Sequence, residues 1–174
     1  MTRFVAAILL VFGCTACDSL SPVESADQQE QEEPASPSEL YLVSLVNAAR
    51  TIARSCGASQ HAATSPVSWN SKLETAAQSH SEDMAFEDFF SHTGSDGSSV
   101  ANRVTATAYS WRTVGENIYA GFTEAERAMT AWLDSPGHCR NIMDPDFKEV
   151  GMAVVVSSTS TYQAYWTQVF GAQR

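Results

Sequence analysis

The sequence has few basic residues and gathers them nowhere. Only 10 of its 174 residues are Lys or Arg, against 20 Asp or Glu, which gives a formal net charge of −10. Proteins that bind nucleic acids concentrate Lys and Arg on one face or along one helix. Because this sequence contains no such cluster, we expect no nucleic acid partner. Its acidity otherwise indicates little beyond solubility.

A long hydrophobic run is also missing. The apolar stretch from Phe4 to Phe12 is about half as long as the ~20 residues that a membrane-spanning helix needs. It follows Arg3 and precedes the small residues of "GCTAC". One basic residue, a short apolar stretch and small residues are typical of a secretory signal, which we place over residues 1–17.

Two cysteines end this signal. The order apolar-x-Gly-Cys at Cys14 resembles the lipobox of bacterial lipoproteins, whose cysteine becomes the diacylated first residue of the mature chain. The resemblance favours Cys14 over Cys17 as the lipidated residue, and an ordinary cleaved signal is the alternative. We therefore expect an exported protein of the cell envelope. A lipid would anchor it to a membrane, and it would face the periplasm or the exterior.

The next segment, 18–37, nearly lacks large apolar residues. It reads "DSLSPVESADQQEQEEPASP" and carries acidic residues but no basic ones. Such a segment buries too little apolar surface to offset its ordering entropy. We interpret it as a disordered, flexible tether to a single domain over residues 38–174. That domain is about 137 residues long, enough for one core, and it contains no internal repeat.

The domain contains only two cysteines, Cys56 and Cys139. Export places them in an oxidising compartment, where two thiols usually pair. Closing a loop of roughly 80 residues would stabilise the fold by about 4–5 kcal/mol in the entropy model. We therefore predict a disulfide and disfavour Cys139 as a nucleophile or metal ligand.

Periodicity predicts helices first and strands last. Apolar spacing indicates helices over 38–55, 70–89, 99–105 and 123–135, capped in turn by Ser38 and Asn70 and, in the last, by a Thr123–Glu126 capping box. Residues 114–121, between glycines, indicate a short extended or turn segment. Residues 149–158 and 161–170 are rich in β-branched and aromatic side chains and predict an antiparallel hairpin. The expected class is α+β, with helices packed on a small sheet.

Four histidines occur, and two of them lie outside the periodic segments. His61 lies in a polar loop and is expected to have no role, whereas His80 shares the apolar face of a helix and is expected to be a buried, hydrogen-bonded core residue. His92 follows a helix exit and His138 follows a Ser-Pro-Gly turn. Together with Glu116, which comes after a glycine, they can hold a divalent metal or shuttle a proton. Spacing alone supports this site weakly, because the sequence has no HExxH motif.

Five ordered motifs resemble the CAP superfamily, which comprises cysteine-rich secretory proteins, antigen 5 and pathogenesis-related 1 and is also called the SCP domain family. They are "FFSH" at His92, "GENI" at Glu116, "W-L-x-SPGH-x-x-NIM" at 132–143, "EVGMAV" and "YWTQVFG". The match spans 38–174 and is nearest to the bacterial branch. It implies an α-β-α sandwich, with a small antiparallel sheet between helices. It also implies a central cleft, which two histidines and two acidic residues line in eukaryotic members.

The sequence matches only some of the site residues of the family. His92, Glu116 and His138 match three family positions, but the second acid falls near Ser135, with Asp134 adjacent. The remaining three residues offer Zn²⁺ or another divalent cation three ligands and an open position.

Three functions remain open. The favoured one is a non-enzymatic binding module whose cleft takes a divalent cation, a lipid or a peptide. The alternative is a hydrolase of the peptidase type, which would use a metal-bound water or Ser135 activated by a histidine. No GxSxG motif supports the serine version. A third is a structural or interaction role at the cell surface, with the cleft as a relic.

Overall fold

The structure, a computed structural model, describes residues 35–174. The predicted signal, both candidate lipidation cysteines Cys14 and Cys17, and residues 18–34 of the predicted tether lie outside this range. Within the described range, none of the helices is both long and apolar enough to cross a membrane.

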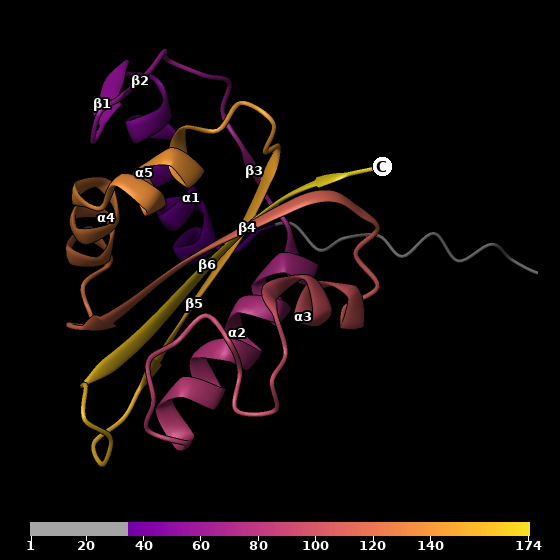
Figure 1. Cartoon of the computed structure of the whole chain (residues 1–174), viewed down its shortest axis with the longest axis vertical. Coiled ribbons are helices and arrows are strands. Elements are labelled where there is room, and N and C mark those ends of the chain that lie inside the picture. Colours follow the sequence, from indigo (N-terminus) through magenta and orange to yellow (C-terminus); the bar gives the residue numbers. More distant parts are fainter. Residues whose placement is uncertain (1–34) are drawn as a thin grey trace, which may run out of the picture. The chain divides into compact units, whose positions relative to one another are not determined.

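Five helices and six strands make up the described chain (Figure 1). The helices are α1 (Pro37–Arg50), α2 (Ser71–Phe86), α3 (Val100–Ala106), α4 (Ala125–Asp134) and α5 (Pro136–Met143). The strands are β1 (Arg54–Cys56), β2 (Ser59–His61), β3 (Ser68–Trp69), β4 (Trp111–Gly121), β5 (Glu149–Val156) and β6 (Ala164–Gln173).

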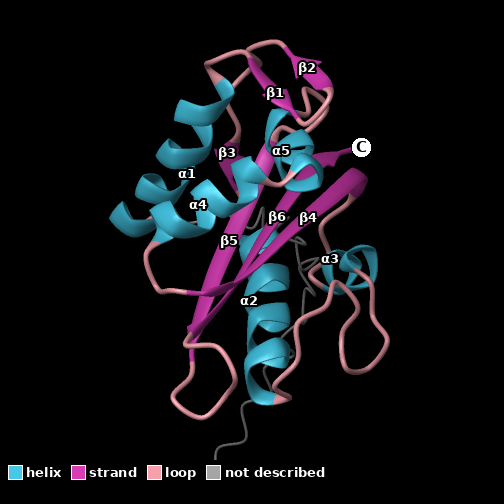
Figure 2. Ribbon diagram, turned by 60° about the vertical axis from the view of Figure 1, so that its left-hand side comes forward, coloured by secondary structure: helices cyan, strands magenta, loops and turns pink. Residues whose placement is uncertain are grey.

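Four strands form one sheet in the order β3-β5-β6-β4. The pairs β5–β6 and β4–β6 are antiparallel, and the short β3 runs parallel to β5. The helices α2 and α3 cover one face, while α1, α4 and α5 cover the other (Figure 2). Every residue of β6 but the last is buried, because this strand lies inside the sheet with helices on both faces. The predicted α-β-α sandwich is confirmed.

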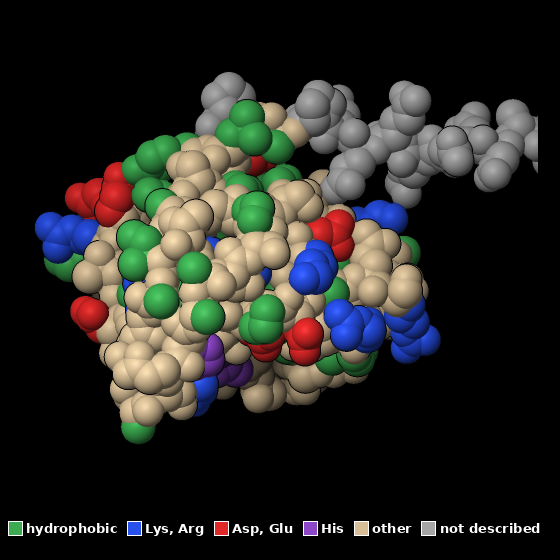
Figure 3. Space-filling model, turned by 90° about the horizontal axis from the view of Figure 1, so that it is seen from above, with side chains coloured by type: hydrophobic (Ala, Val, Ile, Leu, Met, Phe, Trp, Pro, Cys, Tyr) green, Lys and Arg blue, Asp and Glu red, His purple; other side chains and the backbone are tan. Residues whose placement is uncertain are grey.

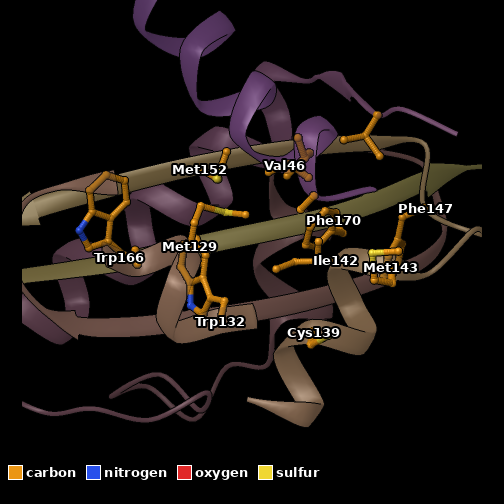
Figure 4. Packing of buried hydrophobic residues seen from close by; sticks show 14 of the residues in the cluster. Val46, Met129, Trp132, Cys139, Ile142, Met143, Phe147, Met152, Trp166 and Phe170 are labelled. Atoms are coloured by element: carbon orange, nitrogen blue, oxygen red, sulfur yellow. The ribbon is translucent and has the colours of Figure 1, made fainter. Parts of the chain in front are cut away.

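The larger core lies between the sheet and α1, α4 and α5 (Figure 4). Trp132 and Ile142, almost fully buried on α4 and α5, pack there with Phe170 of β6. On the other face α2 lies directly on β5, and Gly151 permits this contact. A Cβ at Gly151 would lie 2.0 Å from the backbone nitrogen of Glu74, so any side chain there would collide with the helix.

The predicted elements differ from the structure in several respects. Residues 111–121 form a full strand, β4, instead of a short turn-like segment, and β4 pairs with β6 along its whole length. Residues 136–143 form a helix, α5, which periodicity did not reveal. The small β1–β2 hairpin and β3 were not predicted, and α1 ends at Arg50 instead of residue 55.

Two helix caps were placed wrongly. The N-cap of α1 is Ser36, which precedes Pro37 and forms a capping box with Glu39, so Ser38 already lies inside the helix. The α4 helix begins after Glu124 without a side-chain cap. The expected capping box is absent because Thr123 lies before the N-cap, and the Glu126 carboxylate accepts a hydrogen bond from Tyr41 of α1. The predicted cap of α2 by Asn70 is confirmed, and α3 is capped by Ser99, which forms a capping box with Asn102.

Candidate functional site

Glu116 lies at the centre of the site, on the strand β4. Its side chain is only 3% exposed, and both carboxylate oxygens are engaged. His92 Nδ1 donates to Oε1 over 2.8 Å, and Arg103 Nη2 donates to Oε2 over 2.7 Å. The residue before it must be small, because a Cβ at Gly115 would lie 2.6 Å from the ring of Phe147. The strand therefore brings a buried, ionised carboxylate against one imidazole and one guanidinium.

His92 presents its second nitrogen to solvent. It lies in the loop between α2 and α3, and its side chain is 54% exposed. Since Glu116 accepts a hydrogen bond from Nδ1, the neutral ring carries its lone pair on Nε2. Arg103 also donates to the His92 carbonyl over 3.2 Å. One arginine thus holds both the backbone of His92 and the carboxylate that orients its ring.

His138 faces His92 from the first turn of α5. The two ring centroids are 6.0 Å apart, with their planes at 59°. Two amides position this turn: Asn117 donates to the His138 carbonyl over 3.2 Å, and Asn141 donates to the Glu116 carbonyl over 3.0 Å. Residues far apart in sequence are thereby joined across β4 and α5, and His92, Glu116 and His138 lie close together.

The electrostatics favour an ionised carboxylate at Glu116 and a neutral ring at His138. Burial alone would raise the pKa of Glu116. The hydrogen bond from His92 and the charge of Arg103 outweigh it, and the pKa lies below its ordinary value. Burial, followed by the proximity of His92, lowers the pKa of His138. Near pH 7 the site therefore combines one carboxylate with a neutral His138 imidazole able to bind a cation.

His80 is buried, as predicted, but it also belongs to the site. It is fully buried on α2; its Nε2 lies 2.9 Å from the Ser91 carbonyl and 4.0 Å from Glu116 Oε1. Burial lowers its pKa, although the nearby carboxylate of Glu116 acts in the opposite direction. The apolar pattern of α2 predicted the burial and gave no sign of this second role.

Ser135 and Asp134 occupy the turn between α4 and α5. Ser135 ends α4 and caps α5, and in the described chain its hydroxyl forms no hydrogen bond with His92 or His138. Asp134 is exposed. Neither residue replaces the second acid of the eukaryotic set, and the serine-nucleophile alternative has no activated hydroxyl in this geometry.

A disulfide holds the chain at Cys139, the residue after His138. Cys56 and Cys139 are bonded, with Cα atoms 5.4 Å apart, as predicted. The bond ties β1 to α5 immediately after His138. Cys139 is therefore a structural residue.

The three predicted metal ligands meet without forming a three-ligand shell. Among residues 35–174, no group of three His, Cys, Asp or Glu side chains has the geometry to hold a metal ion. Both oxygens of Glu116 are engaged by His92 and Arg103. The two imidazoles are free to act as ligands, and Glu116 lies behind His92 as its hydrogen-bond partner.

A groove of about 650 Å³ lies beside the site, between α2 and α3. Most of its lining residues carry polar side chains, among them Ser79, Asp83 and Arg103, but the surface that they present to the groove is largely apolar. Arg103 thus contacts both the groove and Glu116. On the face of the molecule seen in Figure 3, acidic and basic side chains are interspersed.

The sequence is similar to those of two bacterial proteins. YkwD of Bacillus subtilis (strain 168), an uncharacterized protein, is 31% identical over 132 residues, which cover 76% of this chain and 46% of YkwD. YlbC of the same organism, an uncharacterized membrane protein, is 28% identical over 60% of this chain and 28% of YlbC. The chain thus spans less than half the length of these relatives.

Solved structures show the same fold. An extracellular protein containing an SCP domain from Bacillus anthracis superposes with a TM-score of 0.64 at 22% identity, over 82% of this chain and 45% of that protein. An outer surface protein of Borrelia burgdorferi superposes with a TM-score of 0.64 at 16% identity, over 78% of this chain and 91% of that one. The model of the cysteine-rich secretory protein family, CAP, matches residues 43–170, and this chain belongs to that family.

Proposed function

We propose that this protein is an exported binding module in which His92 and His138 together hold a divalent cation such as Zn²⁺. One observation carries the proposal. The two imidazoles face each other with centroids 6.0 Å apart, and His92 is held in place by a buried carboxylate. Because Nδ1 is bound to Glu116, the lone pair of the neutral His92 ring is on Nε2, which is available to a ligand.

The spacing of the rings fits a shared cation. Zinc–nitrogen bonds of about 2.0–2.1 Å place the centroids of two imidazole ligands about 5–6 Å apart. The Arg103–Glu116–His92 chain matches the outer-shell pattern in which a carboxylate fixes the tautomer and raises the basicity of a metal-bound histidine. Glu116 therefore contributes to binding through His92.

Two protein ligands leave positions open on a tetrahedral cation. A carboxylate or similar anionic group of a peptide or a lipid can occupy these open coordination positions. The groove beside Arg103 can accommodate an extended part of such a ligand. We place binding ahead of hydrolysis because, among residues 35–174, no serine or threonine hydroxyl is hydrogen-bonded to a histidine. Ser135 in particular has no histidine partner.

Export and anchoring are part of the proposal. The disulfide between Cys56 and Cys139 supports an oxidising compartment, since disulfides persist there and are rare in the cytosol. The N-terminal pattern supports a lipid on Cys14. Intact-mass measurement of the mature protein should show a diacylated N-terminal cysteine, and Cys14→Ser should release the protein from the membrane. An unmodified N-terminus beyond Cys17 would contradict the anchor.

Calorimetry of Zn²⁺ with the full chain tests the cation site. We expect binding by the wild type and a loss of at least tenfold in affinity in His92→Ala and in His138→Ala, because each removes one of two ligands. His61→Ala is the matched control, since this histidine lies in the β1–β2 hairpin and should leave affinity unchanged. Equal affinities in all four proteins would exclude the site.

A further inference from the structure

His80 occupies an unusual place for a core histidine. It is fully buried in the middle of α2, where its ring lies 6.3 Å, edge to face, from that of Phe89. Only one of its two nitrogens has a partner. Nε2 lies 2.9 Å from the Ser91 carbonyl, whereas Nδ1 is buried without any hydrogen bond among the described residues.

This pattern fixes the tautomer. A carbonyl oxygen only accepts hydrogen bonds, so Nε2 of His80 must carry the hydrogen. Nδ1 then keeps the lone pair, and no described acceptor lies near enough for a proton on that nitrogen. A second proton would also create a buried cation near Arg103. The ring is therefore a neutral donor with one fixed direction.

The N–H of His80 Nε2 points to the loop that carries His92 of the candidate site. The acceptor, Ser91, immediately precedes His92, whose Nδ1 binds Glu116 Oε1 over 2.8 Å. The same oxygen lies 4.0 Å from His80 Nε2. A single N–H of α2 thus fixes the carbonyl beside His92 and lies next to the carboxylate that orients its ring.

We propose that His80 is a positioning residue, which sets the place and the ring orientation of His92 through the Ser91 carbonyl. The loop from residue 87 to 92 is exposed at most of its positions and is not held by regular secondary structure. Without the donor on α2, the Ser91 carbonyl loses its hydrogen bond to the helix, and His92 is held only by Arg103 and Glu116. The His92 ring then no longer keeps one geometry toward Glu116 and His138. The zinc readout below rests on the proposed function.

Two substitutions separate positioning from packing. His80→Leu keeps an apolar side chain in the core and removes the donor. His80→Gln removes the ring but returns an N–H near the Nε2 position. We expect His80→Leu to lower Zn²⁺ affinity by about 10–100-fold, as removal of outer-shell partners does, and His80→Gln to recover most of this loss. Equal affinities in wild type and a folded His80→Leu would overturn the proposal, as would equal losses in both variants.

Imidazole NMR of the full chain supplies a second readout that needs no metal. The wild type should show His80 as the Nε2–H tautomer and His92 as the Nδ1–H tautomer. His80→Leu should shift the His92 ring signals and leave those of His61 unchanged, whereas His80→Gln should restore them. An Nδ1–H tautomer of His80 in the wild type would overturn the proposal even if no variant folds. Absence of zinc binding in the wild type would remove the proposed function, while the His92 signals would still decide the role of His80.

Discussion

Arg103 of α3 and Glu116 of β4 form an ion pair of 2.7 Å that is almost closed to solvent, with side chains 7% and 3% exposed. This pair attaches a short surface helix to the central sheet at the point where the site is built. Arg103 extends the attachment through hydrogen bonds to the carbonyls of Ser98 and His92.

Loss of Arg103 should be costly. We expect Arg103→Met to lower the free energy of unfolding by about 3–5 kcal/mol, because it leaves the Glu116 carboxylate buried without its cation. Urea denaturation measures the change. The control is Arg127→Met, whose partner Glu124 lies 3.8 Å away with both side chains more than half exposed, and which should cause little change. Similar losses in both variants would contradict a special role for the buried pair.

Glu116 should make the fold sensitive to acid. Its pKa in the folded protein lies below the ordinary 4.5, so the folded state binds the proton more weakly than the unfolded chain does. The stabilisation is therefore complete above about pH 4.5 and is lost as the pH falls through the lowered pKa of Glu116. Denaturation curves of wild type and Glu116→Gln between neutral pH and this acidic range measure the effect. The variant should be less stable at neutral pH and should lose less stability on acidification. Parallel pH profiles would refute the assignment.

Reduction of the disulfide should weaken the domain. We expect Cys56→Ser with Cys139→Ser to cost about 2–5 kcal/mol in unfolding free energy, because the open chain gains conformational freedom. Chemical denaturation compares the variant with the oxidised wild type. Thiol labelling of the native exported protein should leave both cysteines unmodified, and labelling of either one would contradict the bond.

Gly151 should tolerate no side chain. Gly151→Ala would place a Cβ 2.0 Å from the Glu74 nitrogen, and α2 has to move off β5 to relieve the collision. We expect the melting temperature to fall by several degrees or more, since overpacking costs about 1–3 kcal/mol and a backbone contact yields less than a side chain does. Gly137→Ala is the control, since its nearest atom would be 3.9 Å away and alanine favours a helix. Equal melting temperatures for wild type and Gly151→Ala would contradict the tight contact.

The sequence predicted those parts of the fold that follow from local periodicity. Helices such as α2 were found because one buried face leaves a regular pattern. The β5–β6 hairpin was found because its strands are rich in β-branched and aromatic residues. The strand β4 was misread because its buried centre includes the polar Glu116 and Asn117, which are paired by distant residues. Polar side chains inside a sheet interrupt the apolar alternation that indicates a strand.

The site was predicted only in part, because some of its residues act through partners that are distant in the sequence. His92, Glu116 and His138 stood out through the ordered motifs, and they do meet. The supporting residues Arg103 and Asn141 were missed because their function depends on partners that only the tertiary structure brings near. An arginine in a short polar helix gives no local sign that its guanidinium will be buried against a carboxylate. The engagement of Glu116 by Arg103 also changed its expected role from ligand to orienting residue.

Because His138 directly precedes Cys139, the site is complete only in a compartment where the Cys56–Cys139 disulfide can form. The helix α5 is tied to β1 only after oxidation, so a newly made chain in a reducing cytosol holds His138 on a helix without its covalent brace. In the proposed export, the bond forms only after translocation. If the pair of imidazoles holds a cation, as proposed, the cation is bound in the envelope. Recombinant protein made in a reducing host would accordingly need oxidative refolding before its cation content is informative.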